Sequence, residues 1–73
     1  MEDVLLVIEK AMEYHRLVRI IYEKDGEFTE RVIRPNFIKN DELHAYCCMR
    51  HGKRRFRLNN IIAAVMLPEK EQQ

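Results

Sequence analysis

The alternation of apolar and polar residues along the chain changes its period once, close to the N-terminus. Residues 3–15 carry apolar side chains at the spacing of an amphipathic helix, and Asp3 stands where an N-cap is expected. From Leu17 onward, apolar and polar residues alternate with a period of two, which is typical of β-strands. The pattern therefore predicts one N-terminal helix followed by a β-rich remainder.

Turn signals divide the β-rich part into five short strands. An Asp-Gly pair marks a hairpin turn at 24–27, and a second turn is expected at 39–42. Pro35 and Asn36 are expected to interrupt the second strand, His51 and Gly52 to form a two-residue hairpin turn, and Pro68 to end the last strand. The strands then span residues 17–23, 28–34, 43–50, 53–58 and 61–67, with a short resumption at 37–38.

The length and the number of strands together predict the fold class. Seventy-three residues suit one small domain, which we place at 1–68 with a polar tail at 69–73. Five short strands in so short a chain favour a strongly bent sheet or barrel that limits its free edges. We therefore expect a mainly β fold in which the helix covers one open end or face of the barrel.

Charge is distributed unevenly along the chain. The formal net charge is only +1, but residues 1–42 carry seven Lys/Arg against ten Asp/Glu, whereas residues 43–73 carry six against two. Five of those basic residues and no acid fall in segment 46–58, interleaved with aromatic and apolar residues. Such local asymmetry predicts a surface that binds a polyanion.

The expected register of this hairpin separates its polarity. If His51 and Gly52 form the turn, one face is mostly basic and the other is apolar except for Arg54, which either lies at the hairpin tip or points into a pocket. The basic face would carry Tyr46, Cys48, Arg50, Lys53, Arg55 and Arg57. Arginine suits phosphate because its planar fork donates two parallel hydrogen bonds, and a tyrosine can stack on a base. The alternative is a solvated outer face with acids from the first half nearby.

Other chemistry finds little support in the sequence. Cys47 and Cys48 are adjacent and would point to opposite faces of a strand, so they do not form a disulfide framework, and a reducing cytoplasm is expected. With His44 and His51 they fit no standard zinc spacing. We predict no catalytic residues, metal or cofactor, and no apolar segment is long enough to span a bilayer.

The same residues resemble the WYL domain, a small SH3-like or Sm-like barrel. This domain is found mainly in bacterial transcription regulators and also in some DNA helicases and defence-associated proteins. The resemblance rests on IEKA at 8–11, RIIY at 19–22, RVIRP at 31–35, AYC at 45–47, Arg50, Arg54, FRL at 56–58 and Ile61. The Trp-Tyr-Leu that names the family aligns with Asp41, Glu42 and Leu43, so only the leucine is kept, and a histidine common in the family is Cys48 here.

The resemblance implies a regulatory module in which basic residues bind an anionic effector. The residues that it implicates are Arg31, Tyr46, Arg50, Arg54 and Arg57, with Tyr22 as a further candidate. We expect a non-enzymatic module that recognises single-stranded DNA, another nucleic acid or an anionic ligand, within a larger helicase or transcription regulator. The alternatives are a protein-interaction or homodimerisation module that pairs through strand 61–67, and a sensor of a small anionic second messenger.

Overall fold

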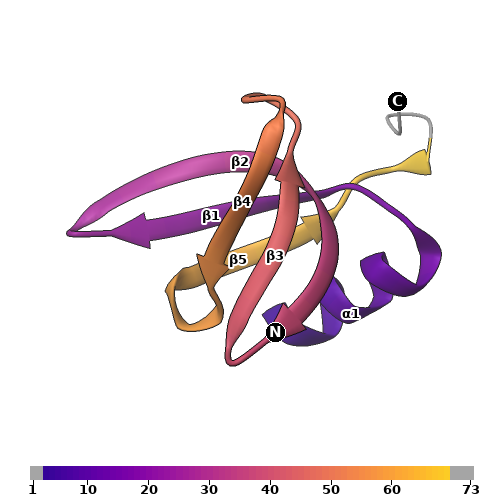
Figure 1. The fold of residues 1–73 in the computed structure, drawn as a ribbon, viewed down its shortest axis with the longest axis horizontal. Helices are drawn as coiled ribbons and strands as arrows, with labels where there is room; N and C mark the ends of the chain where they lie inside the picture. Colours follow the sequence, from indigo (N-terminus) through magenta and orange to yellow (C-terminus); the bar gives the residue numbers. More distant parts are fainter. Residues whose placement is uncertain (1–2, 70–73) are drawn as a thin grey trace.

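One helix precedes five antiparallel strands in the computed structural model, which describes residues 3–69 (Figure 1). The elements are α1 (Val4–Tyr14), β1 (Val18–Lys24), β2 (Glu27–Lys39), β3 (Glu42–Cys47), β4 (Gly52–Arg57), the 3-10 turn η1 (Leu58–Asn60) and β5 (Ile61–Met66). This order confirms the predicted mainly β fold class. Of the predicted tail, residues 70–73 lie outside the described part.

Helix α1 has the ends that its sequence favours. The Asp3 carboxylate accepts a hydrogen bond from the Leu5 N–H at 3.1 Å, which confirms the predicted N-cap. His15 ends the helix with φ 56, in the left-handed region that helix C-caps often adopt. Val7, Ile8 and Ala11 form the buried stripe, so the helix is held by packing on the sheet.

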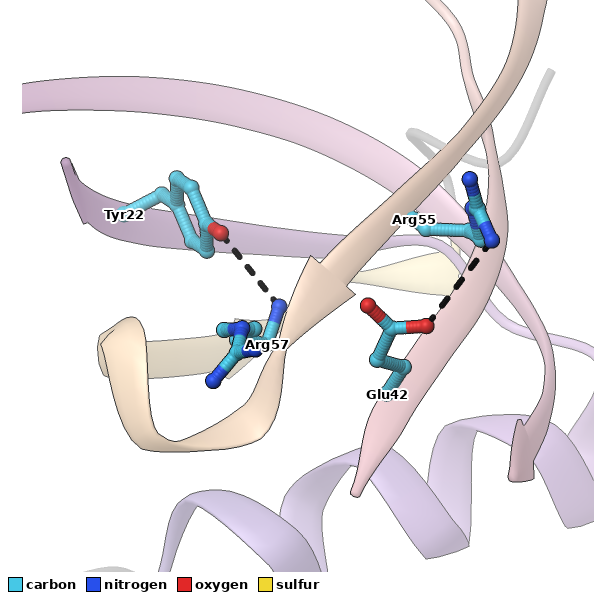
Figure 2. Close-up of polar contacts among 4 residues, drawn as sticks. All are labelled: Tyr22, Glu42, Arg55 and Arg57. Atoms are coloured by element: carbon cyan, nitrogen blue, oxygen red, sulfur yellow. Dashed lines mark hydrogen bonds and ion pairs between the residues drawn. The ribbon is translucent and has the colours of Figure 1, made fainter. Parts of the chain in front are cut away.

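The five strands form one sheet in the order β4-β3-β2-β1-β5. Within the described residues, β4 and β5 each pair with one neighbour, so the sheet is open and the predicted closure into a barrel is not found. The Tyr22 side chain reaches from β1 to β4 instead. Its hydroxyl accepts a hydrogen bond from the backbone N–H of Arg57 at 3.3 Å (Figure 2). The Tyr22 ring also meets Phe56 edge to face at 5.1 Å, so β1 and β4 are joined by side chains rather than by a strand ladder.

Strand β2 is the long, curved element that connects the two parts of the sheet (Figure 1). Its first half pairs with β1 and its second half with β3. The concave side holds the core, in which Ile20, Ile33 and Leu43 are fully buried beneath α1. No helix in the described residues is long and apolar enough to cross a membrane.

Positive φ angles mark the first two of the three hairpin turns that the sequence predicted. Asp25 and Gly26 have φ 54 and 80, and Asn40 and Asp41 have φ 53 and 64. Left-handed values at both central residues are those of type I′ turns, which match the twist of antiparallel strands. Both predicted turns are therefore confirmed as two-residue hairpin connections.

The expected interruption at Pro35 is wrong, because β2 continues through it. Pro35 pairs with Ala45 and Phe37 with His44, which leaves Asn36 as an extra residue in a β-bulge. A bulge accommodates proline because it disturbs the ladder where the missing N–H would otherwise be needed. Because of the bulge, odd-numbered residues such as Ile33 and Pro35 face the core before it, and the even-numbered Ile38 faces the core after it.

The turn between β3 and β4 is longer than predicted. Cys47 pairs with Gly52, so residues 48–51 form a four-residue connection in place of the expected His51-Gly52 turn. His51 has φ 53, but Gly52 is not in the left-handed region that a type I′ turn would require. β3 ends three residues earlier than expected and β4 begins one residue earlier, so Tyr46 pairs with Lys53 in place of Arg57 and the register shifts by four residues. Because the shift is even, the strand residues keep their predicted faces, whereas Cys48 and Arg50 leave the strand.

Candidate nucleic-acid interface

Three rows of side chains cross the outward side of β2, β3 and β4. The register places Arg34, Tyr46 and Lys53 in one row, Phe37, His44 and Arg55 in the next, and Lys39, Glu42 and Arg57 in the third. We call these nine residues the basic outer face. The residues between them in sequence, such as Leu43, Ala45 and Phe56, point inward and are buried. The alternation of side chains along each strand therefore separates an apolar side of the sheet from a charged side.

The basic outer face brings together part of the predicted site. Tyr46, Lys53, Arg55 and Arg57 lie on it and are exposed, as the expected face assignment required. Arg50 lies in the exposed turn beyond the end of both strands. The predicted set is therefore continuous along β4 but not across the turn.

Charge on this face is almost all of one sign. Among the described residues Glu42 is its sole acid, and its carboxylate lies 4.0 Å from the Arg55 guanidinium (Figure 2). Both side chains are exposed enough for solvent to screen the pair, so it contributes little to stability. Within residues 3–69, Lys53 and Arg57 have no salt bridge at all. These cations are available to an anionic partner.

Two aromatic residues that sequence reasoning missed also lie on the face. The Phe37 and His44 rings stack at 4.4 Å between centroids and 11° between planes. The bulge at Asn36 turns Phe37 outward, and half of its surface is exposed. A Phe directly after a Pro-Asn pair was the signal available in the sequence, but the direction of its side chain depends on the bulge.

The remaining predicted residues lie on the inner side of the sheet, in a groove. Tyr22, Arg31 and Arg54 line this inner groove, which has a volume of about 470 Å³. Acids and a lysine from the β1–β2 hairpin share it, so its charge is more balanced than that of the basic outer face. Its other lining residues are Lys24, Asp25, Glu27, Thr29, Phe56 and Arg55, the last of which it shares with the basic outer face. Of the two positions left open for Arg54, the structure shows the one in a pocket.

Arg31 also contacts the buried Cys47 thiol behind the groove. Burial opposes ionisation of Cys47, but the backbone N–H groups of Arg50 and Met49 and the guanidinium of Arg31 outweigh it. The pKa of the Cys47 thiol therefore lies below its ordinary value. Cys47 thus interacts both with Arg31, which lines the groove, and with the backbone of the turn that carries Arg50. Among the described residues no cluster of His, Cys, Asp or Glu is suited to hold a metal ion.

Comparisons with known proteins identify a matching domain family and a solved structure with a similar fold. The family model described as the WYL domain matches residues 3–66. A search of curated proteins finds no match. Among solved structures, Proteasome accessory factor B/C (PafBC) of Arthrobacter aurescens is similar, with a TM-score of 0.78 and 28% sequence identity. The match covers 85% of this chain and 11% of the PafBC chain, so the chain corresponds to a small part of that protein.

Proposed function

The chain belongs to the WYL domain family, and from this premise we propose that it is a non-enzymatic regulatory module that binds single-stranded DNA through its basic outer face. Domains of this family are regulatory and bind ligands or nucleic acids. The choice of a single strand, and of this face, is our own inference. It rests on the residues that the face presents.

One observation carries the proposal: cations and aromatic rings share the same exposed rows. Lys53, Arg55 and Arg57 follow one another on the outward side of β4, and Tyr46 lies directly opposite Lys53. Binders of single strands combine a positive surface for the backbone with rings on which bases stack. We assign the three cations to phosphates and Tyr46 to stacking on a base, with Arg50 extending the track at the turn.

The match covers 11% of the PafBC chain, which supports a place for this domain within a larger protein. We propose that this protein is a transcription regulator or a helicase, in which the module reports the presence of a single strand to a neighbouring domain. A module with no catalytic constellation can act in this way, because binding alone shifts the population of its conformations.

Titration of a labelled single-stranded oligonucleotide at two salt concentrations tests the proposal. Each phosphate neutralised by a cation releases counterions, so affinity should fall steeply as salt rises. Lys53→Gln should weaken binding and flatten this dependence. Arg19→Gln is the matched control, because Arg19 is an exposed cation on β1 that pairs with Glu30 at 3.2 Å, away from the basic outer face. No binding by the wild type at low salt would refute the proposal.

The inner groove favours a second candidate, a sensor of a small anion. Arg31 and Arg54 come from different strands and line the same open groove, whose volume lies within the usual range of about 300–1,000 Å³ for ligand pockets. Arginine is suited to phosphate at either site. The two candidates differ in the cations that they need: Lys53 on the face for a single strand, and Arg31 in the groove for a small anion.

A further inference from the structure

We propose that the hollow beside the Phe37–His44 stack is a binding pocket for one unpaired nucleobase of a single strand. The inference rests on the proposed function and names how the basic outer face holds a base. The hollow has a volume of about 370 Å³, which suits one small planar ligand with its attached phosphate. It is lined by Asn36, Phe37, His44, Lys53 and Arg55, together with Ala45 and Arg54.

The walls of the hollow differ in chemistry. Aromatic ring surface comes from Phe37 and His44, which belong to neighbouring strands and are already parallel within 11°. Cationic side chains come from Lys53 and Arg55 on β4. A nucleotide has the complementary construction, a flat ring joined to a phosphate. A base that extends the stack would therefore leave its phosphate near the cations.

A purely structural role does not account for this arrangement. Aromatic pairs across strands do stabilise sheets, and the Phe37–His44 contact contributes in that way. However, Phe37 remains 51% exposed and points away from the core, so a large apolar surface stays in contact with water. It is also surrounded by cations rather than by other apolar groups, which makes an anionic aromatic ligand a better partner than an apolar protein surface.

The pocket requires a base that is not paired. In a duplex the ring faces are covered by neighbouring bases, whereas in a single strand they can be splayed out onto protein rings. Asn36 lines the same hollow, and its amide offers a donor and an acceptor to a base edge. The bulge thus places a ring and a polar amide in adjacent positions on the strand.

Fluorescence anisotropy with an oligo-dT probe and an abasic probe of the same length tests the proposal. Phe37→Leu should weaken oligo-dT binding by about tenfold or more, in line with the loss of one stacked base. It should leave the abasic probe unaffected, because that probe offers phosphates but no bases. Phe28→Leu is the control, since Phe28 is also an exposed Phe on β2 but lies outside the face. That variant should bind oligo-dT within twofold of wild type.

The possible results separate this proposal from the proposed function. If wild-type protein binds oligo-dT with a salt dependence but Phe37→Leu binds equally well, the base pocket is refuted and the proposed function stands. An equal loss on both probes also refutes the pocket. If wild-type protein binds neither probe, both proposals fail. His44→Leu supplies an independent variant of the stack, and a thermal melt confirms that each variant is folded.

Discussion

The basic outer face and the inner groove contain the same kinds of residue but arrange them differently. On the face, Lys53, Arg55 and Arg57 project from one strand in one direction and meet a single acid. In the groove, Arg31 and Arg54 come from strands that are not neighbours in the sheet, and acids share the space. An open row of cations suits the repeating phosphates of a polymer, whereas two cations that converge on one groove suit a single small anion. The same residue types therefore favour different ligands in the two regions, because the strands arrange them differently.

The largest expected effect comes from removing two cations at a time. Lys53→Gln with Arg55→Gln should reduce single-strand affinity and lower the slope of log K against log salt by roughly 1.4, since each phosphate contact contributes about 0.7. Arg31→Gln should leave that slope unchanged and instead abolish any binding of inorganic pyrophosphate, because Arg31 lines the groove and not the hollow beside Phe37. Salt-dependent anisotropy and calorimetry measure the two arms. Equal effects of the double variant and of Arg31→Gln on single-strand binding would show that the two surfaces form one site.

An intermediate effect is expected at the contact that joins the two regions. Tyr22→Phe removes the hydroxyl that accepts from the Arg57 N–H but keeps the ring on Phe56 (Figure 2). The free energy of unfolding should fall by about 0.5–1.5 kcal/mol, the net contribution of one hydrogen bond. For a domain of this size, each 1 kcal/mol corresponds to a fall of roughly 4–8 °C in Tm.

Thermal melts followed by circular dichroism measure the change. Tyr14→Phe is the control, because Tyr14 is an exposed tyrosine at the end of α1. If both variants melt at the wild-type temperature, Tyr22 does not hold β4 in place. In that case the groove and the face are not mechanically joined by this contact.

The smallest expected effect concerns the sole acid of the basic outer face. Glu42→Gln removes the carboxylate 4.0 Å from Arg55 and should increase single-strand affinity by about twofold to fivefold, in keeping with the low strength of exposed pairs. Glu30→Gln breaks the corresponding pair with Arg19, away from the face, and should not change affinity. Weaker binding after Glu42→Gln would contradict the idea that this acid opposes an anionic ligand.

Local patterns in the sequence predicted much of the fold and of the basic outer face. Asp3 as a cap and Asp25-Gly26 as a turn are set by neighbours in sequence, and both are confirmed. The faces of Tyr46 and Lys53 follow from a period of two, which survives an even change of register. The identity of the family was also readable, because its residues recur in order along the chain.

Features that depend on distant pairing were not predictable in the same way. The bulge at Asn36 is set by how β2 meets β3, so the outward direction of Phe37 and its stack with His44 were missed. Arg31 and Arg54 were each identified, but their meeting in one groove depends on the curvature of the whole sheet. The contact between Tyr22 on β1 and the backbone of Arg57 on β4 depends on the same curvature.

The bulge in β2 lets this small domain carry one additional residue within a strand without exchanging the two faces of that strand. Before it, Ile33 and Pro35 face the core; after it, Ile38 does. In a regular strand Asn36 would shift the alternation by one residue, so that Phe37 would turn inward and Ile38 would lie on the surface. Because the bulge absorbs Asn36, deletion of this residue should leave an unbroken ladder in which Phe37 still points outward and Ile38 inward.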